Sequence, residues 1–102
     1  MSDIRLAQTA LVKRILEGDG RASSSERRAA FNNSGLTGSL GALVGKVARN
    51  ASRITDEDIA AAKESGLSED QVFEIVVCAA VGQATRQYDT ALAALESATG
   101  KE

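Results

Sequence analysis

The side chains that could perform redox or acid–base chemistry are few. The chain of 102 residues has one cysteine, Cys78, and no histidine. Cys78 lies in the apolar segment Val76-Val77-Cys78-Ala79-Ala80, where a thiol usually packs as a small hydrophobic side chain. Because no second cysteine exists to resolve a sulfenic acid, we do not expect a thiol cycle within one chain.

Three adjacent carboxylates, Asp56, Glu57 and Asp58, are the only acidic cluster that could suggest a metal or an acid–base site. They lie at a predicted helix start, where negative charge compensates the helix dipole, and side chains at consecutive positions of a helix point in different directions. Histidine, the commonest metal ligand, is missing. The sequence therefore predicts no metal site and indicates no cofactor.

A polar spot on the longest predicted helix is a better candidate for a binding site. Gln83, Arg86 and Gln87 follow an apolar segment at a spacing of about one turn. If Gln83 and Arg86 face inward, they need polar partners. We therefore treat Arg49, Asp58, Gln83 and Arg86 as candidate contacts of a pocket between the third and the long helix. The alternative is that the solvent-facing side of that helix begins there.

Helices must position these side chains, because the chain has no proline, only three aromatic residues and abundant alanine in helical spacing. The periodicity predicts helices over about residues 3–17, 24–32, 37–50, 55–65 and 72–97. In the first, Ile4, Ala7, Leu11 and Ile15 recur at three and four residues. Capping boxes are predicted at Ser23 with Glu26, Thr55 with Asp58, and Ser68 with Gln71, and Gly66 is the predicted cap after the fourth helix.

We therefore expect a single all-α domain over residues 1–102, a compact bundle of about five helices whose long C-terminal helix forms the core. Small residues line one face of two helices: Gly41, Gly45, Ala48 and Ser52 on the third, and Ala79, Ala80, Gly82 and Ala84 on the long one. Such faces allow close packing within the chain or between subunits. Because large side chains are scarce, we expect part of the apolar surface to be buried by self-association.

Charge and hydropathy exclude several classes of function. Residues 1–51 carry eight Lys/Arg and four Asp/Glu, whereas residues 52–102 carry four and ten. The basic residues are scattered and the chain is acidic overall, so nucleic-acid binding is not expected. The longest apolar run, residues 75–82, is far too short to span a membrane, which takes about 20 residues, and no signal peptide is recognised. We expect a cytoplasmic protein.

The segment from Val47 to Leu95 resembles the carboxymuconolactone decarboxylase and alkylhydroperoxidase-D-like family. The resemblance rests on residues 55–59 (TDEDI), residues 65–74 (SGLSEDQVFE) and the alanine-rich helix through Val81, Gly82, Arg86 and Leu92. It implies an alkylhydroperoxidase-D-like helical fold that assembles into dimers, trimers or hexamers.

The chain lacks the residues that peroxidase members of that family use. Counting back from Gly66, the family's histidine falls on Asp58, its two cysteines on Ile54 and Ala51, and its glutamate on Ser39. The resemblance thus implies a divergent member with a degenerate active site, without the CxxC and histidine motif. The decarboxylase branch also uses histidine, which this sequence lacks.

Three hypotheses follow for the function. The first is a non-redox helical protein that assembles with itself or docks onto a partner protein. The second is a small-molecule-binding protein or enzyme that uses a pocket between the third and long helices. The third is a peroxide-reducing enzyme that relies on Cys78 and an external thiol. The sequence leaves open whether the protein is an enzyme, and names no substrate or partner.

Overall fold

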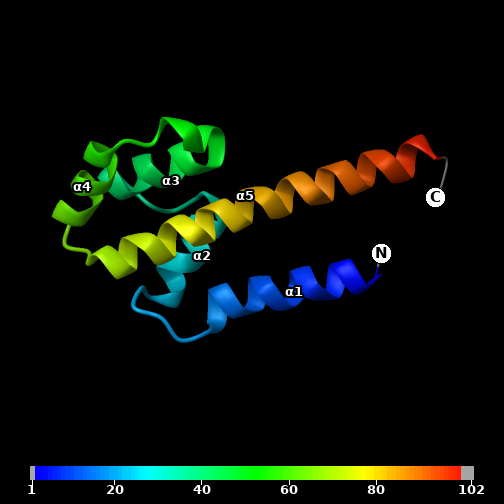
Figure 1. Ribbon diagram of the computed structural model, residues 1–102, viewed down its shortest axis with the longest axis horizontal. Helices are drawn as coiled ribbons and strands as arrows, with labels where there is room; N and C mark the ends of the chain where they lie inside the picture. Colours follow the sequence, from blue (N-terminus) through cyan, green and yellow to red (C-terminus); the bar gives the residue numbers. More distant parts are fainter. Residues whose placement is uncertain (1, 100–102) are drawn as a thin grey trace.

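The computed structural model describes residues 2–99 and confirms the all-α class with a long C-terminal helix (Figure 1). Its helices are α1 (Ser2–Glu17), α2 (Ser24–Asn32), α3 (Gly38–Asn50), α4 (Asp56–Glu64) and α5 (Glu69–Ala98), with a short 3-10 helix η1 (Ala51–Arg53) between α3 and α4. The described residues contain no β-strand. None of their helices combines the length and hydropathy needed to cross a lipid bilayer.

The helix boundaries follow local signals in the sequence. All three predicted capping boxes are present. The hydroxyls of Ser23, Thr55 and Ser68 each accept a hydrogen bond from the backbone N–H three residues further on, and the side chain of that residue accepts one from the backbone N–H of the cap residue. Gly66, after α4, has a φ of 109°, a conformation that glycine adopts without the steric cost of a Cβ. Because these motifs need only neighbouring residues, the sequence predicts the helix ends within a few positions.

The core lies where the first half of α5 packs against α2 and α3. Leu43 and Val44 of α3 and Ile75 and Cys78 of α5 are its largest fully buried side chains. The first half of the long helix is therefore central, as the sequence predicts. It is not buried on every side, because Phe73 remains 67% exposed.

A close crossing of α2 over α5 fixes the position of α2. The carbonyl oxygen of Phe31, at the end of α2, lies 2.0 Å from the point where a Cβ on Gly82 would be built. The same oxygen accepts a hydrogen bond of 2.6 Å from Arg86 Nη1, one turn further along α5. The glycine in the small-residue face of the long helix thus serves packing within the chain.

The second half of α5 extends beyond the core. In Figure 1, α2, α3 and α4 gather around the first half of α5, and only α1 runs beside the rest, in the opposite direction. The radius of gyration is 15.2 Å and the principal extents are 50 × 28 × 20 Å, whereas a domain of about 100 residues typically has a radius near 13 Å. One end of the molecule is therefore a pair of helices with no third layer.

The apolar repeat of α1 meets the core only at its C-terminal end. Leu16 is buried, and Gln8, Val12 and Ile15 are half-buried, with Ile15 packed against the core, whereas Ala7 and Leu11 are exposed. The predicted helix is confirmed, but Ala7 and Leu11 of its apolar repeat lie outside the core. The Oε1 atom of Gln8 is buried without a hydrogen-bond partner among the described residues.

Candidate functional site

A groove of about 630 Å³ runs between α1 and α5 and ends at the loop that joins α1 to α2. Leu11 and Ile15 of α1 face Phe73 and Val77 of α5 across it. Its remaining lining is polar or small: Arg14, Gly18, Asp19, Arg27, Glu74 and Cys78. The groove thus has apolar walls and a charged end.

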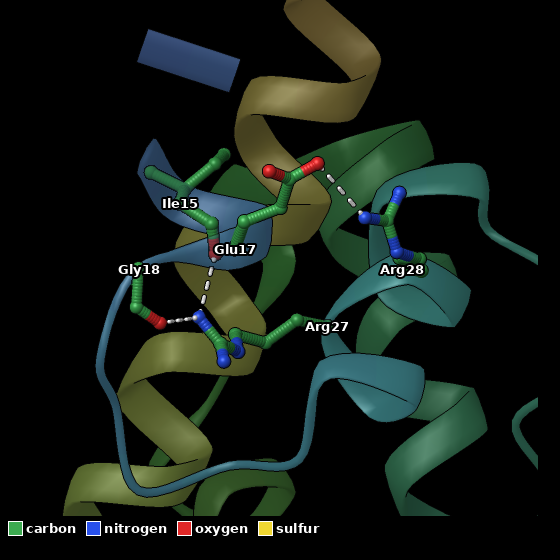
Figure 2. A network of polar contacts seen from close by, with 5 residues as sticks. All are labelled: Ile15, Glu17, Gly18, Arg27 and Arg28. Carbon is green, nitrogen blue, oxygen red and sulfur yellow. Dashed lines mark hydrogen bonds and ion pairs between the residues drawn. The ribbon is translucent and has the colours of Figure 1, made fainter. Parts of the chain in front are cut away.

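Arg27 of α2 forms the buried part of the charged end and is only 8% exposed. Its Nη1 donates to the carbonyl oxygens of Ile15 at 3.1 Å and Gly18 at 2.8 Å, as Figure 2 shows. These carbonyls belong to the end of α1, where the helix has no amides left to pair with them and where positive charge is favoured. Arg27 therefore fastens the end of α1 to α2.

Glu74 of α5 fixes the loop on the other side of the groove. Its carboxylate accepts the backbone N–H of Arg21 at 2.9 Å and that of Ala22 at 2.8 Å. Gly20 lies so close that a Cβ there would come within 2.7 Å of Glu74 Oε1. This loop is therefore shaped around the carboxylate.

The same contacts set the charge state of Glu74. Burial acts to raise its pKa, but the N–H groups of Ala22 and Arg21 and the positive charge of Arg27 outweigh burial, so the pKa of Glu74 lies below its ordinary value. In Asp58, the hydrogen bond from Lys46 and then the N–H of Thr55 lower the pKa in the same direction.

These lowered values predict a loss of stability in acid. The unfolded chain binds more protons wherever the folded pKa lies below the unfolded one, about 4.5 for Glu and 3.8 for Asp. The two carboxylates therefore stabilise the fold fully above those values and lose the effect as the pH falls through their folded pKa values. Urea titrations at pH 7 and at a series of pH values below 4 should show this loss of stability, with a smaller pH dependence for Glu74→Gln. An unchanged pH dependence in that variant would contradict the role of Glu74.

Cys78 lies at the floor of the groove and is 1% exposed. Burial raises the pKa of its thiol, against the opposing effect of Arg27 and with a further increase from Glu74. The Sγ atom lies 3.7 Å from the carbonyl oxygen of Ile15, to which the thiol donates. A buried, protonated thiol is a poor nucleophile, so the groove has no activated sulfur.

Two of the residues predicted to line a pocket, Gln83 and Arg86, do lie together. Arg86 Nη2 donates to Gln83 Oε1 at 3.1 Å while Nη1 holds the Phe31 carbonyl. Both side chains border a shallow groove of about 490 Å³ on one side of α5, whose lining comes from α5 alone. Arg86 thus has a structural role at the α2 crossing.

The other two, Asp58 and Arg49, have different neighbours. Asp58 Oδ2 accepts from Lys46 Nζ at 2.7 Å and from the backbone N–H of Thr55 at 2.9 Å. Arg49 is exposed, and its guanidinium lies over Gly45. No hydrogen bond within residues 2–99 joins either residue to Gln83 or Arg86. Within the same range, no group of three side chains converges to hold a metal ion.

The sequence analysis named Leu11, Ile15 and Cys78 of the α1–α5 groove, but it did not single out the charged residues Arg27 and Glu74. Arg27 and Arg28 are adjacent in an otherwise polar helix, and nothing in their order shows which one is buried. The sequence around Glu74 could not predict its hydrogen bonds, because the backbone N–H groups that it binds are about 50 positions away along the chain. One feature of the sequence could have predicted an exposed apolar residue such as Phe73: the long helix is apolar on more sides than one core can cover.

An apolar strip on the side of α5 that borders α1 continues from this groove: Phe73 and Val77 line the groove, and the Arg5 guanidinium of α1 lies over the ring of Tyr88. Its members recur every three or four residues and therefore share one side of the helix. Each of them is exposed or half-buried. They are Phe73, Val77, Ala80, Ala84, Tyr88, Ala91 and Leu95. We call these seven residues the outer stripe. The stripe contains no charged residue and spans about 33 Å at the α-helical rise.

Comparisons of the chain with protein-family models, with curated proteins and with solved structures gave no match.

Proposed function

We propose that the protein works by self-association, as a helical homodimer formed through the outer stripe of α5 and the adjoining side of α1, without dithiol redox chemistry. The observation that carries this proposal is the outer stripe itself. It leaves Phe73 and Leu95 exposed by 67% and 57%, and Leu11 of α1 by 48%. Contiguous apolar surface of this kind marks interaction sites in proteins that are otherwise polar outside.

The order of side chains along the stripe fits a second copy of the same chain. Ala84 lies at its centre, and the other six residues form pairs at equal distances on either side: Ala80 with Tyr88, Val77 with Ala91, and Phe73 with Leu95. In an antiparallel two-fold arrangement centred on Ala84, each member of a pair meets the other member on the second copy. Val77 then packs against Ala91, and the part of Tyr88 that Arg5 of its own chain leaves uncovered packs against the small Ala80.

Charge agrees with this arrangement, and the available surface suits a small interface. The stripe of about 33 Å and the 16-residue α1, about 24 Å long, present a footprint of roughly 570 Å² at a width of about 10 Å each, which is at the low end of the sizes of protein–protein interfaces. Helix α1 carries three basic and two acidic residues, whereas α5 carries one basic and five acidic. The α1 helix of one copy can therefore approach α5 of the other with opposite net charge. The family resemblance, which implies an assembling fold, adds to the proposal.

The test is a charge at the centre of the stripe. Ala84→Arg places two like charges beside each other at the two-fold axis. We therefore expect it to convert the dimer into a monomer, close in mass to one wild-type chain of 10.6 kDa, with unchanged helix content by circular dichroism. Sedimentation equilibrium measures the mass. Ala60→Arg, an equivalent change at an exposed alanine of α4, is the control and should remain dimeric.

Two outcomes would contradict the proposal. If the wild-type protein is still a monomer at a concentration of about 100 μM, self-association is excluded. If the Ala84→Arg protein remains a dimer, the dimer forms through another face. A cross-link tests the register: in a Cys78→Ala background, Ala84→Cys should form an intermolecular disulfide under mild oxidation, whereas Ala60→Cys should not.

A further inference from the structure

We propose that a second groove, between α1 and α2, binds a phosphate monoester that carries an apolar body. The groove has a volume of about 470 Å³, and Thr85 of α5 completes its lining. It lies on the other side of α1 from the α1–α5 groove, since Thr9 and Lys13, which line it, are each about 200° around the helix from Leu11. None of its lining residues belongs to the outer stripe, so it is separate from the proposed dimer face.

The charged residues of this groove are mostly basic. Arg5, Lys13 and Arg28 line it together with one acid, Glu17. Lys13 and Glu17 are neighbours on one row of α1, whereas Arg28 approaches from α2 and donates from Nη2 to Glu17 Oε2 at 3.2 Å (Figure 2). Because Lys13 precedes Glu17 by one turn, the Lys13 and Arg28 side chains lie within about one helical turn of each other along the groove. One anion can therefore contact both.

These cations retain donors that the fold does not use. Arg28 uses Nη2 for Glu17 and Arg5 uses Nη1 for Asp89. Both guanidinium side chains are about half exposed, so a ligand from solvent reaches their remaining N–H groups. Lys13 is exposed and takes part in no ion pair within residues 2–99. Even when Asp89 is counted together with Glu17, the groove keeps an excess of one positive charge.

The deeper part of the groove is apolar. Its lining there is Val12, Leu16 and Phe31, of which Leu16 is buried and the other two are half-buried. The volume lies within the range of about 300–1,000 Å³ that is usual for small-molecule sites. Since the cations lie at the exposed rim and the apolar side chains lie below them, the groove suits a ligand with an anionic head group and an apolar body.

A phosphate fits the rim better than a carboxylate does. It offers three acceptor oxygens and a charge of about −1.5 to −2 at pH 7, so that Lys13, Arg28 and the hydroxyl of Thr9 can each bind a different oxygen. A carboxylate has two oxygens and one charge, and would leave one of these three groups without a partner. The single carboxylate of Glu17 opposes the ligand, but it is itself paired with Arg28.

A set of matched ligands tests the two parts of the groove without changing the protein. 1-Naphthyl phosphate, 1-naphthol and inorganic phosphate are compared by calorimetry at pH 7 and low ionic strength. We expect 1-naphthyl phosphate to bind about tenfold more tightly than either of the others, because each of them lacks one half of the contacts. 1-Naphthoate should bind more weakly than 1-naphthyl phosphate, and added salt should lower the affinity for both. Equal affinity for 1-naphthyl phosphate and 1-naphthol, or no binding of 1-naphthyl phosphate, would overturn the proposal.

Protein variants locate the site. Lys13→Gln should weaken 1-naphthyl phosphate by about tenfold, the loss of one charge-assisted hydrogen bond, whereas Lys63→Gln, the same change at an exposed lysine of α4, should not. Val12→Thr keeps the shape of the side chain and should weaken 1-naphthyl phosphate but not inorganic phosphate. If Lys13→Gln and Lys63→Gln lower the affinity equally, the ligand responds to net charge alone and the proposal fails. Since the groove is complete within one chain, these titrations decide the matter whether or not the protein dimerises.

Discussion

Gly82→Ala lowers the free energy of unfolding by about 2–3 kcal/mol, because the new methyl group has no space. A Cβ at this position would lie 2.0 Å from the Phe31 carbonyl oxygen and 2.7 Å from its carbon. These are backbone atoms, so α2 must move as a unit and weaken the bond from Arg86 to the same oxygen. Helix propensity gained by replacing glycine, at most about 1 kcal/mol, offsets part of the cost.

The matched control is Gly45→Ala in the middle of α3. The three atoms nearest to its Cβ would all belong to the guanidinium of Arg49, at 3.0–3.4 Å, and that exposed side chain can turn away. The same substitution should therefore leave stability unchanged or raise it by up to about 1 kcal/mol. Urea denaturation at one fixed protein concentration measures both variants. If Gly82→Ala is as stable as Gly45→Ala, α2 does not cross α5 at this point.

Arg27→Met lowers the free energy of unfolding by about 2 kcal/mol, because it removes two hydrogen bonds from a charged donor to the end of α1. Methionine keeps most of the apolar volume, so the loss reflects the polar contacts. The Ile15 and Gly18 carbonyls lose their partner, and amide exchange should become faster in the last turns of α1 before it does in α3.

Arg28→Met is the control for Arg27→Met, since it changes the next residue in the same way. Figure 2 shows the two arginines on neighbouring positions of α2, one directed at the end of α1 and the other at Glu17. The Arg28–Glu17 ion pair is 3.2 Å long, and both side chains are about half exposed, so its removal should cost less than about 1 kcal/mol. Equal losses in the two variants would show that Arg27 does not hold α1.

The candidate residues named from the sequence show why a pattern of types does not define a site. Asp58 carries the signature of a capping box, and this local role is the one it has, with Lys46 added from α3. Gln83 and Arg86 are one turn apart and contact each other, as their spacing allows, but the carbonyl that Arg86 holds belongs to Phe31, 55 positions away. Sequence spacing could predict the first contact and had no information on the second.

The amino-acid order by itself determined the all-α class, the helix ends and the excess of apolar surface, because capping motifs, helix propensity and periodicity act between residues a few positions apart. Only the tertiary structure decided which apolar sides are buried and which charged side chains meet. Ala7 and Leu11 show the difference: their spacing makes α1 a helix, but the packing of α2 and α3 on α5 leaves them outside the core. Likewise, Arg27 and Glu74 meet the α1–α2 loop through the approach of distant segments, which no local pattern specifies.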